Sequence, residues 1–427
     1  MSVTLRNHIG GKETDANASS TLPVMNPATG EQIASVPLSS AKDVDTAVRA
    51  AAAAFPGWSG TPIKERVQVF YRYKALLERD MASLSELVTR ENGKTLSEAK
   101  AEVEKSIEVT EFACSMPQLI AGEVLEVSRG VECRIDRHPV GVVACITPFN
   151  FPAMVPNWTI PNALVLGNTM VLKPSEFVPL SAMRIAALLQ EAGLPDGVFN
   201  VVHGGQEVVE ALCDHPGIEA LSFVGSTRVA KLVYQRATAH LKRAVCLGGA
   251  KNHLIVLPDA HEEMTASNVA ASMSGCAGQR CMAASAMVAV GGVDHIIRRL
   301  CDEARAIVPG KNLGAVISKQ AKERIERYIT EAEREGATIL VDGRNAVVAG
   351  KEGGYYVGPT VIDNVRPDMK IAREEVFGPV LAIMRAKTVD EAIAIENANP
   401  YGNAASVFTQ NGGLARYVAE RASAGMI

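Results

Sequence analysis

The apolar and polar positions divide the chain into an N-terminal helical stretch and a longer region of alternating helix and strand patterns. In residues 41–127 apolar residues recur at helical spacing, as in AKDVDTAVRAAAAAF and KERVQVFYRYKALLERDMASLSELVTREN. We expect two or three long helices there. Between about 129 and 171, in VECRIDRHPVGVVACITPFNFP and NALVLGNTMVLKP, short β-branched runs are broken by Pro, Gly and Asn. This pattern predicts buried strands separated by functional loops.

Beyond residue 180 helical segments and short apolar runs alternate. The helix-like segment SAMRIAALLQEAGL is accompanied by apolar runs at 198–202, 220–224 and 253–257. Further on, to about 410, we expect helices near 264–276 and 319–336 and strands in SAMVAVGG, ATILVDG, TVIDNV and ASVFTQ. Alternation of this kind is typical of parallel sheets covered by helices on both faces. We therefore predict an α/β protein with two doubly wound parallel-sheet lobes.

Composition narrows the class of protein. A chain of 427 residues exceeds what one core usually organises, and its formal net charge of -4 gives no basic field for nucleic acid. The eight cysteines form no C-x-x-C pair or zinc-like spacing, which favours a reducing compartment without a metal site. MSVTLRNHIG lacks a signal-peptide core, and no apolar run approaches the ~18 residues of a membrane helix. We expect a cytoplasmic protein that acts on small molecules.

Several strand-to-loop transitions carry candidate binding groups, although G-x-G-x-x-G is absent. In LSFVGSTRVAKLV a Gly-Ser-Thr turn opens a helix, so Ser226 can donate to a phosphate. From this stretch alone, an ordinary helix N-cap is the favoured interpretation. In MVLKPSEFVP, Lys173 and Glu176 can bind ribose hydroxyls as donor and acceptor. Taken alone, that pair is more simply explained as a solvated surface pair.

Two further stretches can support chemistry on a carbonyl group. In CITPFNFPAMVP, Asn150 lies between prolines and aromatics, where its amide either donates to an oxyanion or forms a turn. In GCAGQRCMA, Cys276 is best explained as a packed small hydrophobe. Cys281 follows Gly-Gln-Arg280, whose backbone donors and guanidinium can favour the thiolate. A structural role is nevertheless the default for an arbitrary cysteine.

The order of the motifs along the chain favours functional over structural interpretations of these residues. TPFNFP, LKPSE, FVGST, LGGAKN, GQRCMA and EEVFGPV occur in this order between residues 147 and 380, and together they closely resemble the aldehyde dehydrogenase superfamily. GCAGQRCMA and LGGAKNH resemble its methylmalonate-semialdehyde (malonate-semialdehyde) dehydrogenases, which make acyl-CoA. The resemblance implies a discontinuous NAD-binding domain (1–120 and 139–248), an oligomerisation segment (121–138) and a catalytic domain (249–427). It also implies a homo-oligomer, either a dimer or a tetramer.

The resemblance assigns roles to individual residues. Cys281 would attack the aldehyde, and the hemithioacetal would lose hydride to become a thioester, with Asn150 and the Cys281 N–H as oxyanion donors. The acidic Glu176 near the ribose 2′-hydroxyl would favour NAD over NADP. Phe177 occupies the place of a frequent arginine. The implied NAD contacts are Thr147, Phe149, Lys173, Glu176, Phe177, Ser226, Gly248, Glu375 and Phe377.

The acyl acceptor and the substrate follow from two other positions. Hydrolytic members carry a glutamate before Leu-Gly-Gly, whereas Cys246 stands here, which favours coenzyme A over water as acceptor. Of the two arginines that bind a substrate carboxylate in this branch, Arg280 matches one and Lys105 replaces the other. Lysine keeps the charge but loses the fork, which implies a shifted preference among semialdehydes. The expected products are propionyl-CoA or acetyl-CoA and CO2.

Other classes of function stay open at this stage. One is an aldehyde dehydrogenase that releases a free acid, and others are a non-redox cysteine hydrolase and a non-catalytic relative. A serine esterase built on His203-Gly204-Gly205 is disfavoured because G-x-S-x-G is absent. The family continues past RASAGMI, so we expect the C-terminus to be incomplete.

Overall fold

The computed structural model describes residues 3–427, which form two compact units. Unit 1 comprises the chain up to Met25, Gln32–Asn92 and Ala99–Gly248. Unit 2 comprises Asn26–Glu31, Gly93–Glu98 and Gly249–Ile427. The sequence prediction placed Asn26–Glu31 and Gly93–Glu98 in the NAD-binding domain, with the rest of residues 1–120, rather than with residues 249–427.

The N-terminal helical stretch contains four long helices, so the expectation of two or three was wrong. The four long helices are α1 (Ala41–Gly60), α2 (Ile63–Arg79), α3 (Met81–Asn92) and α4 (Leu96–Cys114). The short helix α5 (Met116–Leu119) follows them. Only Asp80 separates α2 from α3, and its carboxylate accepts hydrogen bonds from Arg79 and Arg184. A one-residue break barely disturbs helical spacing, so the apolar pattern runs through it.

A seven-stranded sheet organises unit 1, in the order β12-β11-β8-β9-β10-β2-β3. Strands β8 to β12 are parallel, and β2 and β3 form an antiparallel edge. These strands are β2 (Asn7–Ile9), β3 (Lys12–Thr14), β8 (Val142–Ile146), β9 (Thr169–Lys173), β10 (Phe199–Val201), β11 (Ala220–Val224) and β12 (Arg243–Leu247). A smaller sheet contains β1 (Val3–Thr4), β5 (Glu31–Pro37) and β4 (Thr21–Asn26).

The helices that connect the parallel strands of unit 1 are α6 (Met154–Val165), α7 (Pro179–Glu191), α8 (Gln206–Asp214) and α9 (Thr227–Ala239). Helix α6 includes NALV, which the sequence predicted as strand. Its Ile160 and Leu164 are fully buried, so packing against the core overrides the strand preference of a short apolar run. The Leu164 carbonyl also accepts a hydrogen bond from Trp58 Nε1 at 2.9 Å.

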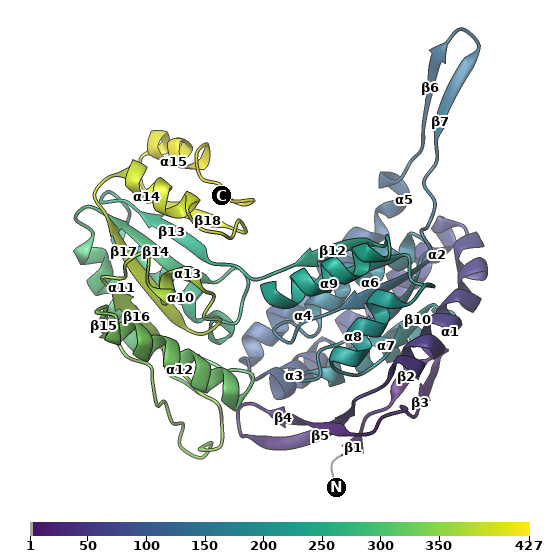
Figure 1. Cartoon of the computed structure of the whole chain (residues 1–427), viewed down its shortest axis with the longest axis horizontal. Helices are drawn as coiled ribbons and strands as arrows, with labels where there is room; N and C mark the ends of the chain where they lie inside the picture. Colours follow the sequence, from purple (N-terminus) through teal and green to yellow (C-terminus); the bar gives the residue numbers. More distant parts are fainter. Residues whose placement is uncertain (1–2) are drawn as a thin grey trace. The chain divides into compact units, whose positions relative to one another are not determined.

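Strands β6 (Glu123–Ser128) and β7 (Val131–Ile135) form a separate hairpin in unit 1. Figure 1 shows this hairpin extending beyond the helices of unit 1. All residues of both strands are exposed. The strand signal at 131–135 was therefore correct, but the prediction that it is buried was wrong, because β7 pairs with β6 alone.

Unit 2 is built on a six-stranded sheet in the order β15-β16-β17-β14-β13-β18, parallel except for β15. Its strands are β13 (Asn252–Val256), β14 (Ala284–Val290), β15 (Thr338–Val341), β16 (Thr360–Asp363), β17 (Val380–Ala386) and β18 (Ala405–Phe408). Its helices are α10 (Glu262–Ser274), α11 (Asp294–Ala306), α12 (Lys319–Arg334), α13 (Lys370–Arg373), α14 (Val389–Asn397) and α15 (Gly412–Ala419).

Alternate residues of β14 pack on opposite faces of the sheet in unit 2. Ala286 and Val288 belong to a core cluster with residues of α12, α14 and α15. Met287 and Ala289 belong to a second cluster with residues of α10 and α11. Because successive strand residues point to opposite faces, helices must cover both sides. The predicted doubly wound α/β class is confirmed, as are the helices and strands expected here.

Glu91 generates a prediction about stability, because its buried carboxylate accepts hydrogen bonds from the N–H groups of Leu180 (2.7 Å) and Ser181 (2.9 Å) in α7. Burial raises the pKa of Glu91 from 4.5 to about 7, with a smaller contribution from Glu102. The folded state therefore keeps the proton that the unfolded chain loses, and its stability falls as pH rises from 4.5 to about 7.

The expected loss over that pH range is about 3 kcal/mol. Glu91→Gln should remove this part of the pH dependence, because glutamine does not ionise. Urea unfolding of both proteins between pH 4.5 and 8 measures the difference. Parallel stability curves for the two proteins would contradict the prediction.

Candidate active site

The carboxyl ends of four parallel strands in unit 1 bring together residues predicted to bind a cofactor. Thr147 follows β8, Lys173 ends β9, Ser226 lies just beyond β11 and Gly248 follows β12. The strands are neighbours in the order β12-β11-β8-β9, so these residues lie along one edge of the sheet. The Thr147 N–H donates to the Lys173 carbonyl at 3.1 Å. Such an edge is where doubly wound sheets bind ligands.

Lys173 and Glu176 form an ion pair at 2.9 Å. The Lys173 side chain is only 6% exposed, so the interpretation as a solvated surface pair is wrong. Burial alone would raise the pKa of Glu176. The charge of Lys173 and its hydrogen bond act in the opposite direction, and the pKa of Glu176 is lowered overall. Glu176 consequently keeps its negative charge, and its carboxylate accepts the hydrogen bond that Lys173 Nζ donates.

His203 is a buried residue of the same region, which motif analysis did not select as a site residue. It lies two positions beyond β10. Burial and the charge of Lys173 lower the pKa of His203 to about 4, so its ring is neutral at pH 7. In the sequence it was considered only within His203-Gly204-Gly205, as part of a disfavoured serine esterase, and was not assigned to the nucleotide site.

The loop that carries Asn150 is fixed by hydrogen bonds at several points. Asn92 Nδ2 donates to the Phe149 carbonyl at 2.8 Å, and Glu102 accepts from the Ala153 N–H at 2.7 Å. Asn150 itself is buried. The rings of Phe149 and Phe177 pack edge to face, with 6.2 Å between the ring centroids. The structure thus holds Asn150 in a constrained loop and brings two predicted cofactor contacts together.

Ser226 occupies the N-cap position of α9, but its side chain makes no capping hydrogen bond. The ordinary cap favoured from the local sequence is therefore wrong in this respect. Its backbone is extended, with φ of -68° and ψ of 147°. A helix start of this kind suits an anion, since the first N–H groups of a helix have no intrahelical partners.

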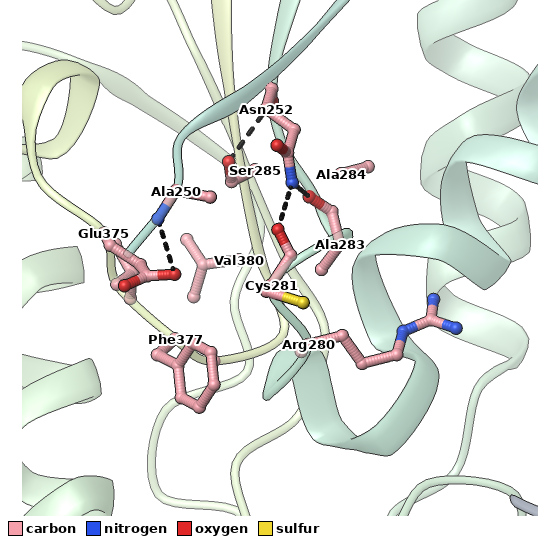
Figure 2. A pocket seen from close by; sticks show the side chains of 13 residues that line it. Ala250, Asn252, Arg280, Cys281, Ala283, Ala284, Ser285, Glu375, Phe377 and Val380 are labelled. Atoms are coloured by element: carbon pink, nitrogen blue, oxygen red, sulfur yellow. Dashed lines mark hydrogen bonds between the residues drawn. The ribbon is translucent and has the colours of Figure 1, made fainter. Parts of the chain in front are cut away.

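In unit 2, Cys281 lies in a tight turn that lines a pocket (Figure 2). The Ala283 N–H donates to the Arg280 carbonyl at 3.1 Å, which places Cys281 second in a four-residue turn. The residues around the pocket are Ala250, Asn252, Gly278, Arg280, Cys281, Ala283, Ala284, Ser285, Glu375, Val376, Phe377, Gly378 and Val380. Cys276 is buried, as expected of a packed small hydrophobe.

Two glycines bring the Cys281 segment close to the Glu375–Phe377 segment. Gly278 has a φ of +70°, and a Cβ built on it would lie 2.0 Å from the Gly378 carbonyl oxygen. Only glycine permits that approach. Glu375 is held by the Ala250 N–H, 3.2 Å from Glu375 Oε1. The predicted nucleophile and both residues predicted for the nicotinamide end therefore line one pocket.

The electrostatics of Cys281 differ from the expectation. Burial raises the pKa of the Cys281 thiol, and the Glu375 carboxylate adds to the rise. The N–H groups of Cys281 and Met282 and the charge of Arg280 act in the opposite direction without cancelling it. Backbone donors and the Arg280 guanidinium thus favour the thiolate, as predicted, but burial and Glu375 outweigh them and the pKa of the thiol is raised overall.

Arg280 directs its guanidinium away from the Cys281 sulfur (Figure 2). Its Nη2 donates to the Ser272 carbonyl at 2.8 Å and to the Ala271 carbonyl at 3.4 Å, near the C-terminal end of α10. A cation is favourable at that end of a helix. The guanidinium thus bonds to the protein backbone rather than to the thiol.

Comparison with known proteins identifies the family. Residues 14–427 match the aldehyde dehydrogenase family. The chain belongs to this family. It is 46% identical to malonate-semialdehyde dehydrogenase 2 of Geobacillus kaustophilus, over 99% of this chain and 89% of that protein. It is 42% identical to human mitochondrial methylmalonate-semialdehyde/malonate-semialdehyde dehydrogenase [acylating], over 99% of this chain and 81% of that protein.

Solved structures give the same result. The structure of methylmalonate-semialdehyde dehydrogenase from Oceanimonas doudoroffii matches with a TM-score of 0.96 at 43% identity, covering 98% of this chain and 88% of that chain. A Sinorhizobium meliloti protein solved with NAD matches with a TM-score of 0.97 at 40% identity, covering 99% of this chain and 88% of that chain. The predicted resemblance to aldehyde dehydrogenases is confirmed.

Two other predicted positions of this aldehyde dehydrogenase lie apart from that pocket lining. Lys105 is on α4, where its exposed ammonium donates to Glu108 at 2.6 Å. Cys246 is a half-buried residue of β12, and burial raises the pKa of its thiol. Across residues 3–427 no helix has the length and apolar character needed to span a membrane. Those residues also contain no group of three or more His, Cys, Asp or Glu side chains placed to hold a metal ion.

Sequence analysis missed two asparagines that contact the backbone of Cys281. Asn252 Nδ2 donates to the Cys281 carbonyl at 2.7 Å, and Asn403 Nδ2 donates to it at 3.0 Å. Asn252 lies within the motif LGGAKNH and could have been found there. Asn403 lies 122 positions from Cys281 in the chain, and no pattern connects the two.

The pocket predicts how the Cys281 thiol responds to pH. The ordinary pKa of a cysteine thiol is 9.0, and burial raises the pKa of Cys281 above that value. In the nucleotide-free protein, alkylation of Cys281 by iodoacetamide should therefore reach half its maximal rate above pH 9.0. Glu375→Gln should lower that midpoint, because it removes a carboxylate that disfavours the thiolate. Mass spectrometry of the Cys281 peptide measures the rate.

Glu374→Gln is the matched control. Its carboxylate, one position away in the chain, accepts a hydrogen bond from the Tyr328 hydroxyl instead. An unchanged midpoint in Glu375→Gln, or an equal shift in both variants, would contradict this account of the pocket.

Proposed function

We propose that the protein is an NAD-dependent, CoA-acylating dehydrogenase of malonate or methylmalonate semialdehyde, which releases acetyl-CoA or propionyl-CoA and CO2. The observation that carries the proposal is the Cys281 turn, which lines a pocket with Glu375 and Phe377 in a chain 46% identical to a malonate-semialdehyde dehydrogenase. Cys246, in place of a water-activating glutamate, supports thiolysis rather than hydrolysis.

The residues on the carboxyl edge of unit 1 fit NAD. Lys173 supplies a donor and Glu176 an acceptor for two ribose hydroxyls, and the carboxylate would repel a 2′-phosphate. Ser226 at the start of α9 suits the pyrophosphate. The solved Sinorhizobium meliloti relative contains NAD. We assign Thr147, Phe149, Phe177 and Gly248 to the same nucleotide site, and Glu375 and Phe377 to the nicotinamide end.

Cys281 starts the proposed reaction. Its thiol gives up a proton to solvent, and the sulfur adds to the aldehyde carbon to give a hemithioacetal oxyanion. The Cys281 N–H and the Asn150 amide donate hydrogen bonds to that oxygen, and each such donor typically contributes about 3 to 4 kcal/mol. NAD held at this site would supply the hydride acceptor, and Cys281 would then carry the acyl group as a thioester.

Acyl transfer completes the cycle. The β-carboxylate leaves as CO2, and the electron pair of the broken bond stays on the α-carbon as a thioester enolate, which takes a proton from water. The CoA thiol then gives up its proton to solvent and attacks the thioester carbon, while the Cys281 thiolate departs. Water is a poor acceptor here because position 246 carries no carboxylate base. A CoA thiol is more acidic and more nucleophilic than water, so it needs less help.

Arg280 and Lys105 are the proposed contacts of the substrate carboxylate. To bind it, the Arg280 guanidinium would exchange the carbonyls of Ala271 and Ser272 for two carboxylate oxygens. The Lys105 ammonium would likewise leave the Glu108 carboxylate and bind the substrate carboxylate. Because lysine offers a point charge without a fork, recognition at that position is less geometric than with arginine.

Assembly and location complete the proposal. The hairpin β6–β7 exposes Val124, Leu125, Val127, Val131 and Ile135, and exposed apolar side chains in this number favour a homo-oligomeric contact, in a dimer or tetramer. Segment 121–138 is thus assigned to oligomerisation, 1–120 with 139–248 to NAD binding and 249–427 to catalysis. All eight cysteines are unpaired within the described residues, which supports a cytoplasmic location.

The reaction itself is tested with malonate or methylmalonate semialdehyde and NAD, by following NADH absorbance and product mass with and without CoA. We expect NADH formation that depends on CoA and yields acetyl-CoA or propionyl-CoA. Cys281→Ala should abolish turnover, whereas Cys276→Ala, at a buried position, is the control. A free acid formed without CoA would instead indicate a hydrolytic enzyme, and an absence of NADH would exclude the redox function.

Cys246→Glu tests the choice of acceptor. A carboxylate restored at this position should activate water, so the variant should gain NADH turnover without CoA and release free acid. Cys246→Gln is the matched control, because it has nearly the same shape but cannot accept a proton. If Cys246→Glu gains no more CoA-independent turnover than Cys246→Gln, position 246 does not decide the acceptor.

A further inference from the structure

The peptide bond between Cys281 and Met282 is held by two side-chain amides from elsewhere in unit 2. Asn252 Nδ2 donates to the Cys281 carbonyl at 2.7 Å and to the Ala283 carbonyl at 2.9 Å. Figure 2 shows this one amide joining both carbonyls. Asn403 Nδ2 donates to the Cys281 carbonyl at 3.0 Å. Both lone pairs of that carbonyl oxygen are therefore occupied.

The two amides donate to a carbonyl that lies just before the start of strand β14. Asn252 is the first residue of β13, and the pairing of β13 with β14 is irregular between Asn252 and His253. Because β14 begins only at Ala284, the strand pairing does not include Cys281, and the Asn252 side chain supplies a donor there. Asn403 comes from the loop before β18, the strand that pairs with β13 on its other side.

A planar peptide transmits this constraint to the sulfur. In a trans peptide the C=O and the following N–H are rigidly linked and point in opposite directions. Fixing the Cys281 carbonyl consequently fixes the Met282 N–H. That N–H and the Cys281 N–H both act to lower the pKa of the Cys281 thiol. A hydrogen bond donated to the thiolate stabilises the charged form.

We propose that Asn252 and Asn403 are positioning residues for the nucleophile, which hold the Cys281–Met282 peptide so that the Met282 N–H is directed at the Cys281 sulfur. This inference rests on the proposed function of Cys281. It adds two residues that touch neither substrate nor cofactor in the proposed mechanism.

The charged groups that act on the Cys281 thiol are Glu375, from the segment after α13, and Arg280, from its own turn. Neither asparagine ionises. A change in the pH response after an asparagine is removed must therefore come from altered hydrogen bonding or geometry at the sulfur, rather than from the loss of a charge.

The experiment measures the rate of iodoacetamide alkylation of Cys281 against pH in the full, nucleotide-free chain. The variants are Asn403→Ala, Asn252→Ala and the double variant, and Asn397→Ala is the control. Asn397 also donates to a backbone carbonyl, that of Arg421 at 2.8 Å, but it does not contact the Cys281 turn. Circular dichroism checks the fold of each protein.

We expect the midpoint of alkylation to move to higher pH in both single variants and further in the double variant. Below the midpoint, the rate in each single variant should fall roughly three- to tenfold, the effect of losing one hydrogen bond. Asn397→Ala should match the unaltered protein. Asn403 is exposed, so its replacement is expected to leave the fold intact and decides the result if Asn252→Ala does not fold.

A folded Asn403→Ala variant with an unshifted midpoint would overturn the proposal, even if its turnover falls, since the asparagine would then act by another route. The alkylation readout needs neither aldehyde, NAD nor CoA. Turnover that persists in Cys281→Ala would thus refute the proposed function separately, without altering the alkylation result.

Discussion

Parallel strand pairing is the constraint on which the arrangement of this aldehyde dehydrogenase depends. Adjacent parallel strands cannot be joined by a tight turn, so each connection crosses a face of the sheet, usually as a helix. The loops that follow the strands then collect at one edge. In unit 1 this places Thr147, Lys173 and Ser226 side by side although the sequence separates them widely. The pattern of strands thus decides which residues can share a ligand.

Burial sets the electrostatics of the candidate site residues in both units. The Lys173–Glu176 pair stays charged because each partner offsets the cost of burying the other, whereas His203 has no such anion and becomes neutral. Cys281 lies between these cases. Its thiol is half-buried, and the backbone N–H groups around it only partly oppose the effect of burial and of Glu375. The geometry of those N–H groups therefore has a direct influence on its reactivity.

Much of the fold could be predicted from the sequence where local pattern and final environment agree. The strands of unit 2 are short apolar runs bounded by turn residues, and they are buried as such runs predict. Predictions were wrong where the environment rather than the local pattern decided the outcome. Helix α6 is helical because Ile160 and Leu164 pack in the core of unit 1, and β7 is exposed because it pairs with β6 alone. The one-residue break at Asp80 leaves the apolar spacing almost unchanged, so the pattern does not reveal it.

The same distinction applies to the candidate site. Motifs contain Cys281, Asn150 and Glu375 because the chemistry of each is tied to its local turn. The solvation of the Lys173–Glu176 pair and the net shift in the pKa of Cys281 could not be predicted, since both depend on total burial. Asn403 could not be predicted because only the pairing of β18 with β13 brings its loop to the Cys281 turn.

The proposed reaction makes two opposite demands on one sulfur. A thiolate of high pKa is the stronger nucleophile towards an aldehyde, but it is the poorer leaving group when CoA attacks the thioester. Hydrogen bonds from the Met282 and Cys281 N–H groups oppose the effect of burial, and they can act in both steps because the peptide that carries one of them is held by neutral amides. A charged group in the same place would shift the balance with its own ionisation. Two asparagines fix the geometry without adding charge, which suits a cysteine that must first attack and later depart.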